Sequence, residues 1–139
     1  MKSFFFNWGP VLFLVGFIFI ISSFPTFAPA PSGLDKVYHF LEYAFLGFLT
    51  TRGILLSGDF SRGWGTFLGA LVALFLGVLD EFHQAFVPAR QASVGDALAD
   101  SLGAIFGAVF YTYLGVLLFK SKVLYKAESS PCDGCPGSQ

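Results

Sequence analysis

The chain has 139 residues, of which 55% are hydrophobic and only 12% charged, and its formal net charge is −1 at pH 7. Soluble domains carry about 25% charged residues, and the 19 Phe residues would overfill the core of a soluble chain of this length. The length predicts one domain. The sequence shows no nucleotide loop and no surface for nucleic acid. We therefore expect an integral membrane protein.

Four apolar segments, 8–24, 37–56, 64–85 and 97–119, approach the length of about 20 residues that a transmembrane helix needs. They are predicted to be helices because hydrocarbon satisfies no backbone polar groups. The predicted fold is all-α, a transmembrane bundle of four helices that forms one membrane domain over residues 1–126. Residues 127–139 are rich in Pro, Gly and Ser and are expected to form a flexible cytoplasmic tail.

The two ends of the chain each leave an alternative open. The first apolar segment and the sequence "FAPA" are similar to a secretory signal, but the basic region is short and Pro31 would follow the cut. We expect an uncleaved first helix followed by an extended, proline-rich outer loop. In the tail, Cys132 and Cys135 form a CxxC pair. This pair is either half of a zinc site or part of an unstructured segment.

The basic residues divide unevenly between the two sides of this bundle. Six of them fall on the side of the two termini, where the net charge is +3, and the other side has six acids, two bases and a net charge of −4. Positively charged loops stay in the cytoplasm. The pattern predicts a multi-pass protein of the cytoplasmic (inner) membrane with both termini cytoplasmic. The acidic side then faces outward.

The second predicted helix starts with polar residues on one face. Asp35 and His39 are one turn apart, and Glu42 and Tyr43 follow three and four residues after His39. Asp35 alone is also explained as a partner of the helix N-terminus. That explanation does not extend to His39 or Glu42, which lie deeper.

The third predicted helix combines a row of small residues with polar residues at its end. Small residues recur every four positions before Glu81, and such rows let another helix approach closely. Glu81 is therefore expected to face protein, with Asp80 and Gln84 beside it. The row consists of Gly65, Gly69, Ala73 and Gly77.

The fourth predicted helix starts where the third one ends. Asp96 and Asp100 are one turn apart, and Gly103 and Gly107 follow on the closest-packing face. Three helices therefore bring acids to the same face of the membrane. Arg90 is expected to be the main counter-charge, whereas His83 is left to solvent.

These residues define a candidate ligand-binding polar cluster, with exposed rim charges as the alternative. Asp, Glu, His and Gln suit a proton relay or a hard divalent cation, which is the candidate cofactor. Arg90 can bind a carboxylate or phosphate. The HExxH zinc pattern is absent. The cluster consists of Asp35, His39, Glu42, Tyr43, Asp80, Glu81, Gln84, Arg90, Asp96 and Asp100.

The segments "DKVYHFLEYAFLGFL" and "DEFHQAFVPARQASVGDALADSLGAIFG" together resemble the VanZ-like family of small bacterial membrane proteins. The resemblance covers residues 35–107 and implies a multi-helix membrane domain related to a protein linked to teicoplanin resistance. The family often has Gly where this chain has Ala89, and Asn where it has Asp100. The matching positions are Asp35, Lys36, His39, Tyr43, Asp80, Glu81, Gln84, Pro88, Arg90, Ser93, Asp96, Gly103 and Gly107.

Two functions from different classes are expected to compete. In the first, an outward-facing polar pocket binds a cell-envelope ligand such as a lipid-linked precursor, with membrane lipids around it. In the second, the chain is a structural or accessory subunit of a larger membrane complex. The polar cluster then pins the helices, and the small-residue faces dock other membrane subunits. An ion-coupled carrier is disfavoured because four helices carry few charges in the middle of the membrane.

Overall fold

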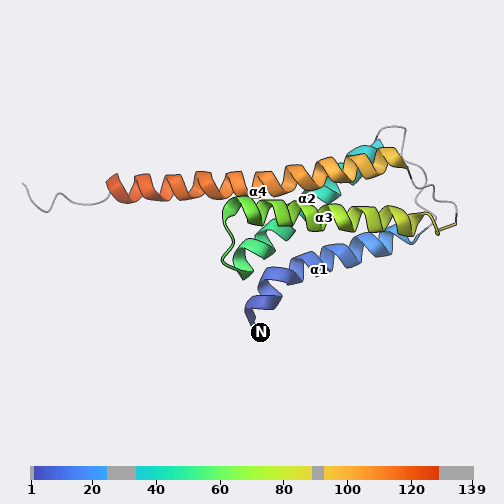
Figure 1. Cartoon of the computed structure of the whole chain (residues 1–139), viewed down its shortest axis with the longest axis horizontal. Coiled ribbons are helices and arrows are strands. Elements are labelled where there is room, and N and C mark those ends of the chain that lie inside the picture. Colours follow the sequence, from blue (N-terminus) through green and yellow to red (C-terminus); the bar gives the residue numbers. More distant parts are fainter. Residues whose placement is uncertain (1, 25–33, 89–92, 129–139) are drawn as a thin grey trace, which may run out of the picture.

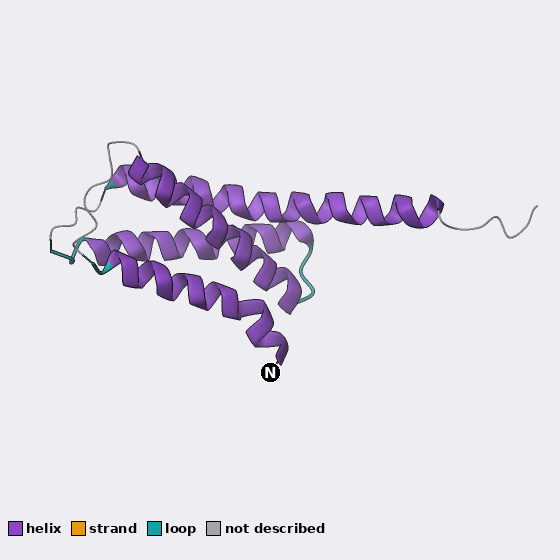
Figure 2. Cartoon of the chain, turned by 180° about the vertical axis from the view of Figure 1, so that it is seen from behind, coloured by secondary structure: helices purple, strands orange, loops and turns teal. Residues whose placement is uncertain are grey.

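A computed structural model describes residues 2–24, 34–88 and 93–128, which form four helices. They are α1 (Lys2–Ser22), α2 (Leu34–Ser57), α3 (Arg62–Gln84) and α4 (Val94–Glu128). Figure 1 shows α1 and α3 running in one direction and α2 and α4 in the other, and Figure 2 shows the same bundle from behind. This arrangement confirms the predicted all-α bundle. We call the end at which α1 and α3 finish and α2 and α4 begin the polar end.

Three helices are long and apolar enough to cross a membrane: Phe4–Ser22, Arg62–Gln84 and Val94–Leu118. The fourth predicted crossing, residues 37–56, lies in α2, which falls outside this group. Four charged residues reduce the apolar character of α2. Helix α2 packs against all three other helices. Its crossing of the membrane stays a prediction, because α2 is not among the three helices that are apolar enough to span. The charged residues of α2 are Asp35, Lys36, Glu42 and Arg52.

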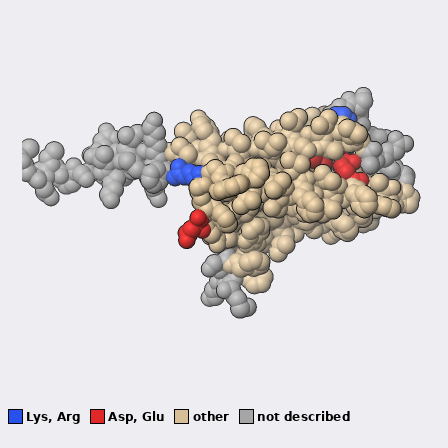
Figure 3. Space-filling model, viewed as in Figure 1, with Lys and Arg blue, Asp and Glu red and all other residues tan. Residues whose placement is uncertain are grey.

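The exterior of the bundle is apolar, and its buried core is small. Large side chains point outward, with Phe13 76% exposed and Phe86 71% exposed. On the face drawn in Figure 3, charged side chains appear only near the two ends of the described bundle. So large an apolar surface requires an apolar solvent or a partner. The buried core consists of Val11, Ile18, Tyr43, Leu46, Leu49, Ala73 and Ala104.

Helices α2 and α4 form the most extensive pair, because glycines let their backbones touch. A Cβ atom on Gly107 would collide with the carbonyl oxygen of Ala44, and one on Gly103 would collide with that of Phe40. The contact is reciprocal, since a Cβ atom on Gly47 of α2 would meet the carbonyl oxygen of Ala104. The predicted close-packing role of Gly103 and Gly107 is confirmed.

The row of small residues on α3 also faces α2. All four members of the row are buried. A Cβ atom would meet Leu55 at Gly65, Thr51 at Gly69 and Tyr43 at Gly77. The packing role of the row is therefore confirmed, and its partner is α2 of the same chain. The small-residue faces of α3 and α4 are thus already occupied, and they are not free to dock another subunit.

Helix α1 is held to α2, away from the polar end, by hydrogen bonds that include a carbonyl which a proline in α1 leaves free. Pro10 lacks a backbone N–H and leaves the carbonyl of Phe6, four residues earlier, without its helical partner. Arg52 of α2 fills that role, because its Nη1 donates to the carbonyl oxygens of Phe6 (3.2 Å) and Asn7 (3.4 Å). Its guanidinium also lies 4.8 Å from the Phe6 ring centroid. Figure 1 shows the first turns of α1 bent away from the rest of the helix, as expected beside a proline.

Replacing Arg52 with Ala is expected to cost about 1.5–3 kcal/mol in the free energy of unfolding, because the carbonyl oxygens of Phe6 and Asn7 lose a charged donor. In a Pro10→Ala background the cost of the same change should fall, since residue 10 then donates to the Phe6 carbonyl itself. A double-mutant cycle followed by denaturant unfolding in detergent measures the difference. An equal cost of Arg52→Ala in both backgrounds would contradict the coupling.

Helix α4 extends beyond its predicted span at both ends. The predicted span covers residues 97–119, whereas α4 begins at Val94 and ends at Glu128. The extension is expected physically, because "KSKVLYKAE" contains neither Gly nor Pro. Residues 127 and 128, which we assigned to the tail, are therefore helical. The rest of the tail, with Cys132 and Cys135, lies outside the described residues, as does most of the first linker.

A candidate polar site at one end of the bundle

The structure brings most of the predicted cluster to the polar end and buries it. Seven of its ten members are buried, whereas Glu42 is half-buried and Asp35 is exposed. Arg90 lies outside the described residues, so its predicted role as counter-charge has no structural test. The burial of the seven excludes the alternative of exposed rim charges for them. They are His39, Tyr43, Asp80, Glu81, Gln84, Asp96 and Asp100.

The centre of the site is a contact between His39 of α2 and Asp100 of α4. His39 Nδ1 lies 2.9 Å from Asp100 Oδ1, and the two residues are 8% and 1% exposed. Each lies one turn further into its helix than the first acid of that helix, Asp35 in α2 and Asp96 in α4. The close approach of α2 and α4 places the imidazole directly against the carboxylate. This pair is the most deeply buried ionisable contact that the structure describes.

Glu81 reaches the same place from α3. Its Oε2 accepts a hydrogen bond from the backbone N–H of Ser93 (3.1 Å), the residue before α4 begins. Its other oxygen, Oε1, is buried without a hydrogen-bond partner in the described part of the chain, and so is Oδ2 of Asp100. Buried carboxylate oxygens without partners are rare, because each forfeits the hydrogen bonds that it made in water.

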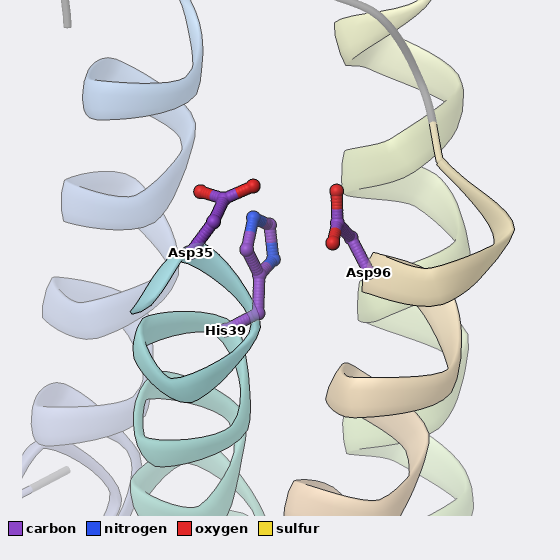
Figure 4. A group of neighbouring side chains, drawn as sticks. All are labelled: Asp35, His39 and Asp96. Carbon is purple, nitrogen blue, oxygen red and sulfur yellow. The ribbon is translucent and has the colours of Figure 1, made fainter. Parts of the chain in front are cut away.

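A second group of ligand-type side chains lies nearer the rim. One ligand atom each from Asp35, His39 and Asp96 lies within 4.8 Å of the others, and Figure 4 shows the imidazole between the two carboxylates. Lys36 Nζ is 3.2 Å from Asp96 Oδ1, with the lysine side chain 54% exposed. Lys36 therefore supplies a positive charge to this rim, a role that the sequence indicated for Arg90.

Asp80 faces α1 and takes no part in the His39 group. Its Oδ2 accepts hydrogen bonds from Ser22 Oγ (3.0 Å) and Gln84 Nε2 (2.7 Å). Asp80 also lines an apolar cavity of about 200 Å³ between α1, α2 and α3, together with Tyr43. The rest of the lining is apolar: Val15, Ile18, Phe19, Leu46, Leu76 and Leu79.

The prediction that His83 is left to solvent was wrong. His83 is half-buried, its ring stacks on Phe19 with centroids 4.3 Å apart, and its Nε2 lies 3.0 Å from Ser23 Oγ. The reason is that α1 packs against α3, and its last turn covers this face of α3. Sequence spacing within one helix does not show which neighbour covers which face.

Two residues of the site were absent from the predicted cluster. Ser22 lies in the predicted first span, 8–24, but was not named as a site residue, although it ends α1 and its hydroxyl donates to Asp80. Ser93 appeared only in the family pattern, yet its backbone N–H holds Glu81. The available signal for Ser22 was its place as a polar residue near the end of an apolar span. No signal in the sequence indicates a backbone donor such as that of Ser93.

A helical bundle with an apolar exterior and buried ionisable residues at one end defines a multi-helix membrane protein with a polar site. The family model for VanZ/LLP1 matches residues 3–119, which contain nearly all of the described bundle. The chain belongs to the VanZ/LLP1 family, and the resemblance seen in the sequence is confirmed. No curated protein matches the chain, and no solved structure does.

Proposed function

We propose that the polar end binds an amphipathic cell-envelope ligand, such as a lipid-linked precursor, with its polar part at the cluster and its chain in the apolar cavity. The observation that carries this proposal is that Asp80 and Tyr43 belong to the cluster and also line the cavity. A polar surface and an apolar cavity therefore meet at the same two side chains. Ligand sites in proteins combine these two features.

The cavity is suited to hydrocarbon. Its volume is about 200 Å³, and an apolar cavity of about 150 Å³ stays dry and binds benzene. Three helices contribute to its walls, so a chain in the cavity would touch α1, α2 and α3 at once. Asp80 belongs to the lining, so a carboxylate borders the apolar walls.

The polar part of such a ligand would need positive charge beside it. Acids outnumber bases at the described polar end, and a phosphate group would be repelled by Asp80 and Glu81. Lys36 and Arg90 can offset that repulsion, and Arg90 can bind phosphate in bidentate fashion. A divalent cation beside His39 would serve the same purpose.

The location in the cell is part of the proposal. The positive side of the bundle is placed in the cytoplasm, which puts the polar end on the outer side of the cytoplasmic membrane. An outward site is where an envelope precursor would be met. The family resemblance connects such a site to glycopeptide, and specifically teicoplanin, resistance.

The site predicts a specific loss of phenotype. Glu81→Gln, Arg90→Lys and Leu79→Trp are expected to return teicoplanin susceptibility to that of the deletion strain, with membrane abundance unchanged. Leu79 lines the cavity but is 45% exposed, so a tryptophan there would narrow the cavity without entering the core. Susceptibility and membrane abundance are measured together in a deletion background.

Two substitutions serve as matched controls. Val78 precedes Leu79, is 55% exposed and does not line the cavity, so Val78→Trp should keep the phenotype. Asp59 is an exposed acid between α2 and α3 at the opposite end, so Asp59→Asn should also keep it. Equal effects of Leu79→Trp and Val78→Trp would refute the cavity as a ligand site.

The second candidate is a structural or accessory subunit. It is favoured by the contacts between helices at the polar end, where His39 meets Asp100 and Ser22 meets Asp80. In that case the cluster acts by holding the bundle together for other membrane subunits. Site variants would then lose abundance, and no phenotype would remain beyond that loss.

A further inference from the structure

We propose that His39, Glu81 and Asp100 bind one divalent transition-metal ion of the Zn²⁺ or Mn²⁺ class inside the polar end. The three side chains come from α2, α3 and α4, and one ligand atom of each lies within 4.8 Å of the others. They are 8%, 8% and 1% exposed. The idea that this ion holds a phosphate group of a ligand rests on the proposed function. The binding of the ion is a property of the chain alone.

Two orphaned oxygen atoms point to a cation independently of the cluster's composition. Glu81 Oε1 and Asp100 Oδ2 are buried, and neither has a hydrogen-bond partner among the described residues. Carboxylate oxygens removed from water need a donor or a cation. An ion placed between these two residues would satisfy both atoms and offset both negative charges, whereas one shared proton offsets a single charge.

The contact distances fit a coordination site. Two ligand atoms at about 2.1 Å from a metal are about 3.0 Å apart at the right angle of an octahedral site and about 3.4 Å apart at the tetrahedral angle. The distance from His39 Nδ1 to Asp100 Oδ1 is 2.9 Å. Without the ion this contact is a hydrogen bond. With the ion it is one edge of the coordination shell, and Asp100 binds through both Oδ1 and Oδ2.

Glu81 is already oriented by its surroundings. The N–H of Ser93 holds Oε2 at 3.1 Å, which leaves Oε1 for the site. Hydrogen bonds of this kind orient metal ligands in known centres. The neighbouring acid Asp96 is paired with Lys36 (3.2 Å), and Asp80 is bonded to Ser22 and Gln84. Among the buried acids of the cluster, Glu81 and Asp100 then remain, and their two charges match that of one divalent ion.

The ligand types select among divalent ions. Mg²⁺ and Ca²⁺ take oxygen ligands, whereas imidazole favours Zn²⁺ and related ions and carboxylates suit Mn²⁺. One imidazole with two carboxylates therefore favours Zn²⁺ or Mn²⁺ over Mg²⁺. No thiol belongs to the group, so the site differs in kind from the CxxC pair of the tail.

Metal content of the full-length protein tests the proposal. Purified protein with Cys132→Ser and Cys135→Ser, which removes thiol binding, is equilibrated with micromolar Zn²⁺ or Mn²⁺ in detergent and desalted. We expect one bound ion per chain by elemental analysis. His39→Gln, Glu81→Gln and Asp100→Asn should each weaken binding by about 10–100-fold or more in isothermal titration. Asp59→Asn is the matched control and should bind as the parent does.

A second measurement covers the case in which a site variant fails to fold. In the parent protein, Zn²⁺ or Mn²⁺ should raise the midpoint of thermal unfolding relative to EDTA, and Mg²⁺ should not. No bound ion in the parent, or equal ion content in Glu81→Gln, Asp100→Asn and Asp59→Asn, would overturn the proposal. Neither measurement uses lipid, so failure here is distinct from failure of the teicoplanin assay with the cavity variants.

Discussion

Gly107→Ala is expected to lower the free energy of unfolding by about 3 kcal/mol, at the upper end of the cost of overpacking. A methyl group at this position would overlap the carbonyl oxygen of Ala44. A backbone atom cannot rotate away as a side chain can, so α2 and α4 would have to separate. Unfolding by SDS in mixed micelles, followed by circular dichroism, measures the change.

Gly115 provides the control on the same helix. A Cβ atom there meets nothing within 4 Å. Gly115→Ala should therefore leave stability unchanged or raise it by up to about 1 kcal/mol, because Ala favours a helix more than Gly does. If Gly107→Ala and Gly115→Ala had the same effect, the close packing of α2 against α4 would be refuted.

His39→Leu is expected to cost about 3–5 kcal/mol, because it leaves Asp100 buried and without its partner. The double change His39→Leu with Asp100→Leu should cost less than His39→Leu alone, since it removes the unpaired charge as well. The cycle is measured by the same SDS unfolding, in EDTA so that bound metal does not contribute. A double variant that loses the sum of the two single costs would contradict the coupling.

Lys36 and Asp96 supply a comparison of the same kind nearer the surface. Their atoms are 3.2 Å apart, but the lysine side chain is 54% exposed. Water screens such a pair, and its coupling is expected to stay below about 1 kcal/mol. The two cycles together separate a contact that requires the interior of the bundle from one that forms at its rim.

The His39–Asp100 and Lys36–Asp96 cycles bear on the choice between the candidate functions. The cluster stabilises the bundle in either case, because His39, Glu81 and Asp100 connect three helices. A ligand or metal site requires more, namely conservative changes that abolish binding while the protein still folds. Glu81→Gln is suited to this purpose, since it keeps the size of the side chain and removes the charge.

Much of the bundle could be predicted from the sequence because membrane helices are determined locally. Apolar segments must be helical in hydrocarbon whatever they pack against, so all four helices were expected. The row from Gly65 to Gly77 predicted a packed face because its spacing repeats along one helix. The crossing of α2 was harder to judge, since the polar residues of α2 depend on their neighbours for burial.

The candidate site could be predicted less completely. Spacing within single helices brought His39, Glu81 and Asp100 to the same depth, but it did not pair them. Asp100 departs from the usual family residue, yet it is the most deeply buried acid of the described cluster. His83 was assigned to solvent and instead stacks on Phe19. These outcomes depend on which helix covers which face.

The sequence by itself determined that this is an all-α membrane protein with a charge difference between its two ends, because composition and periodicity act within each segment. Only the tertiary structure decided that Gly103 and Gly107 pack on α2, that His39 meets Asp100, and that Asp80 turns to α1. Each of these contacts joins residues more than 55 positions apart along the chain. Such contacts are selected by the mutual fit of helix faces, which no single segment encodes.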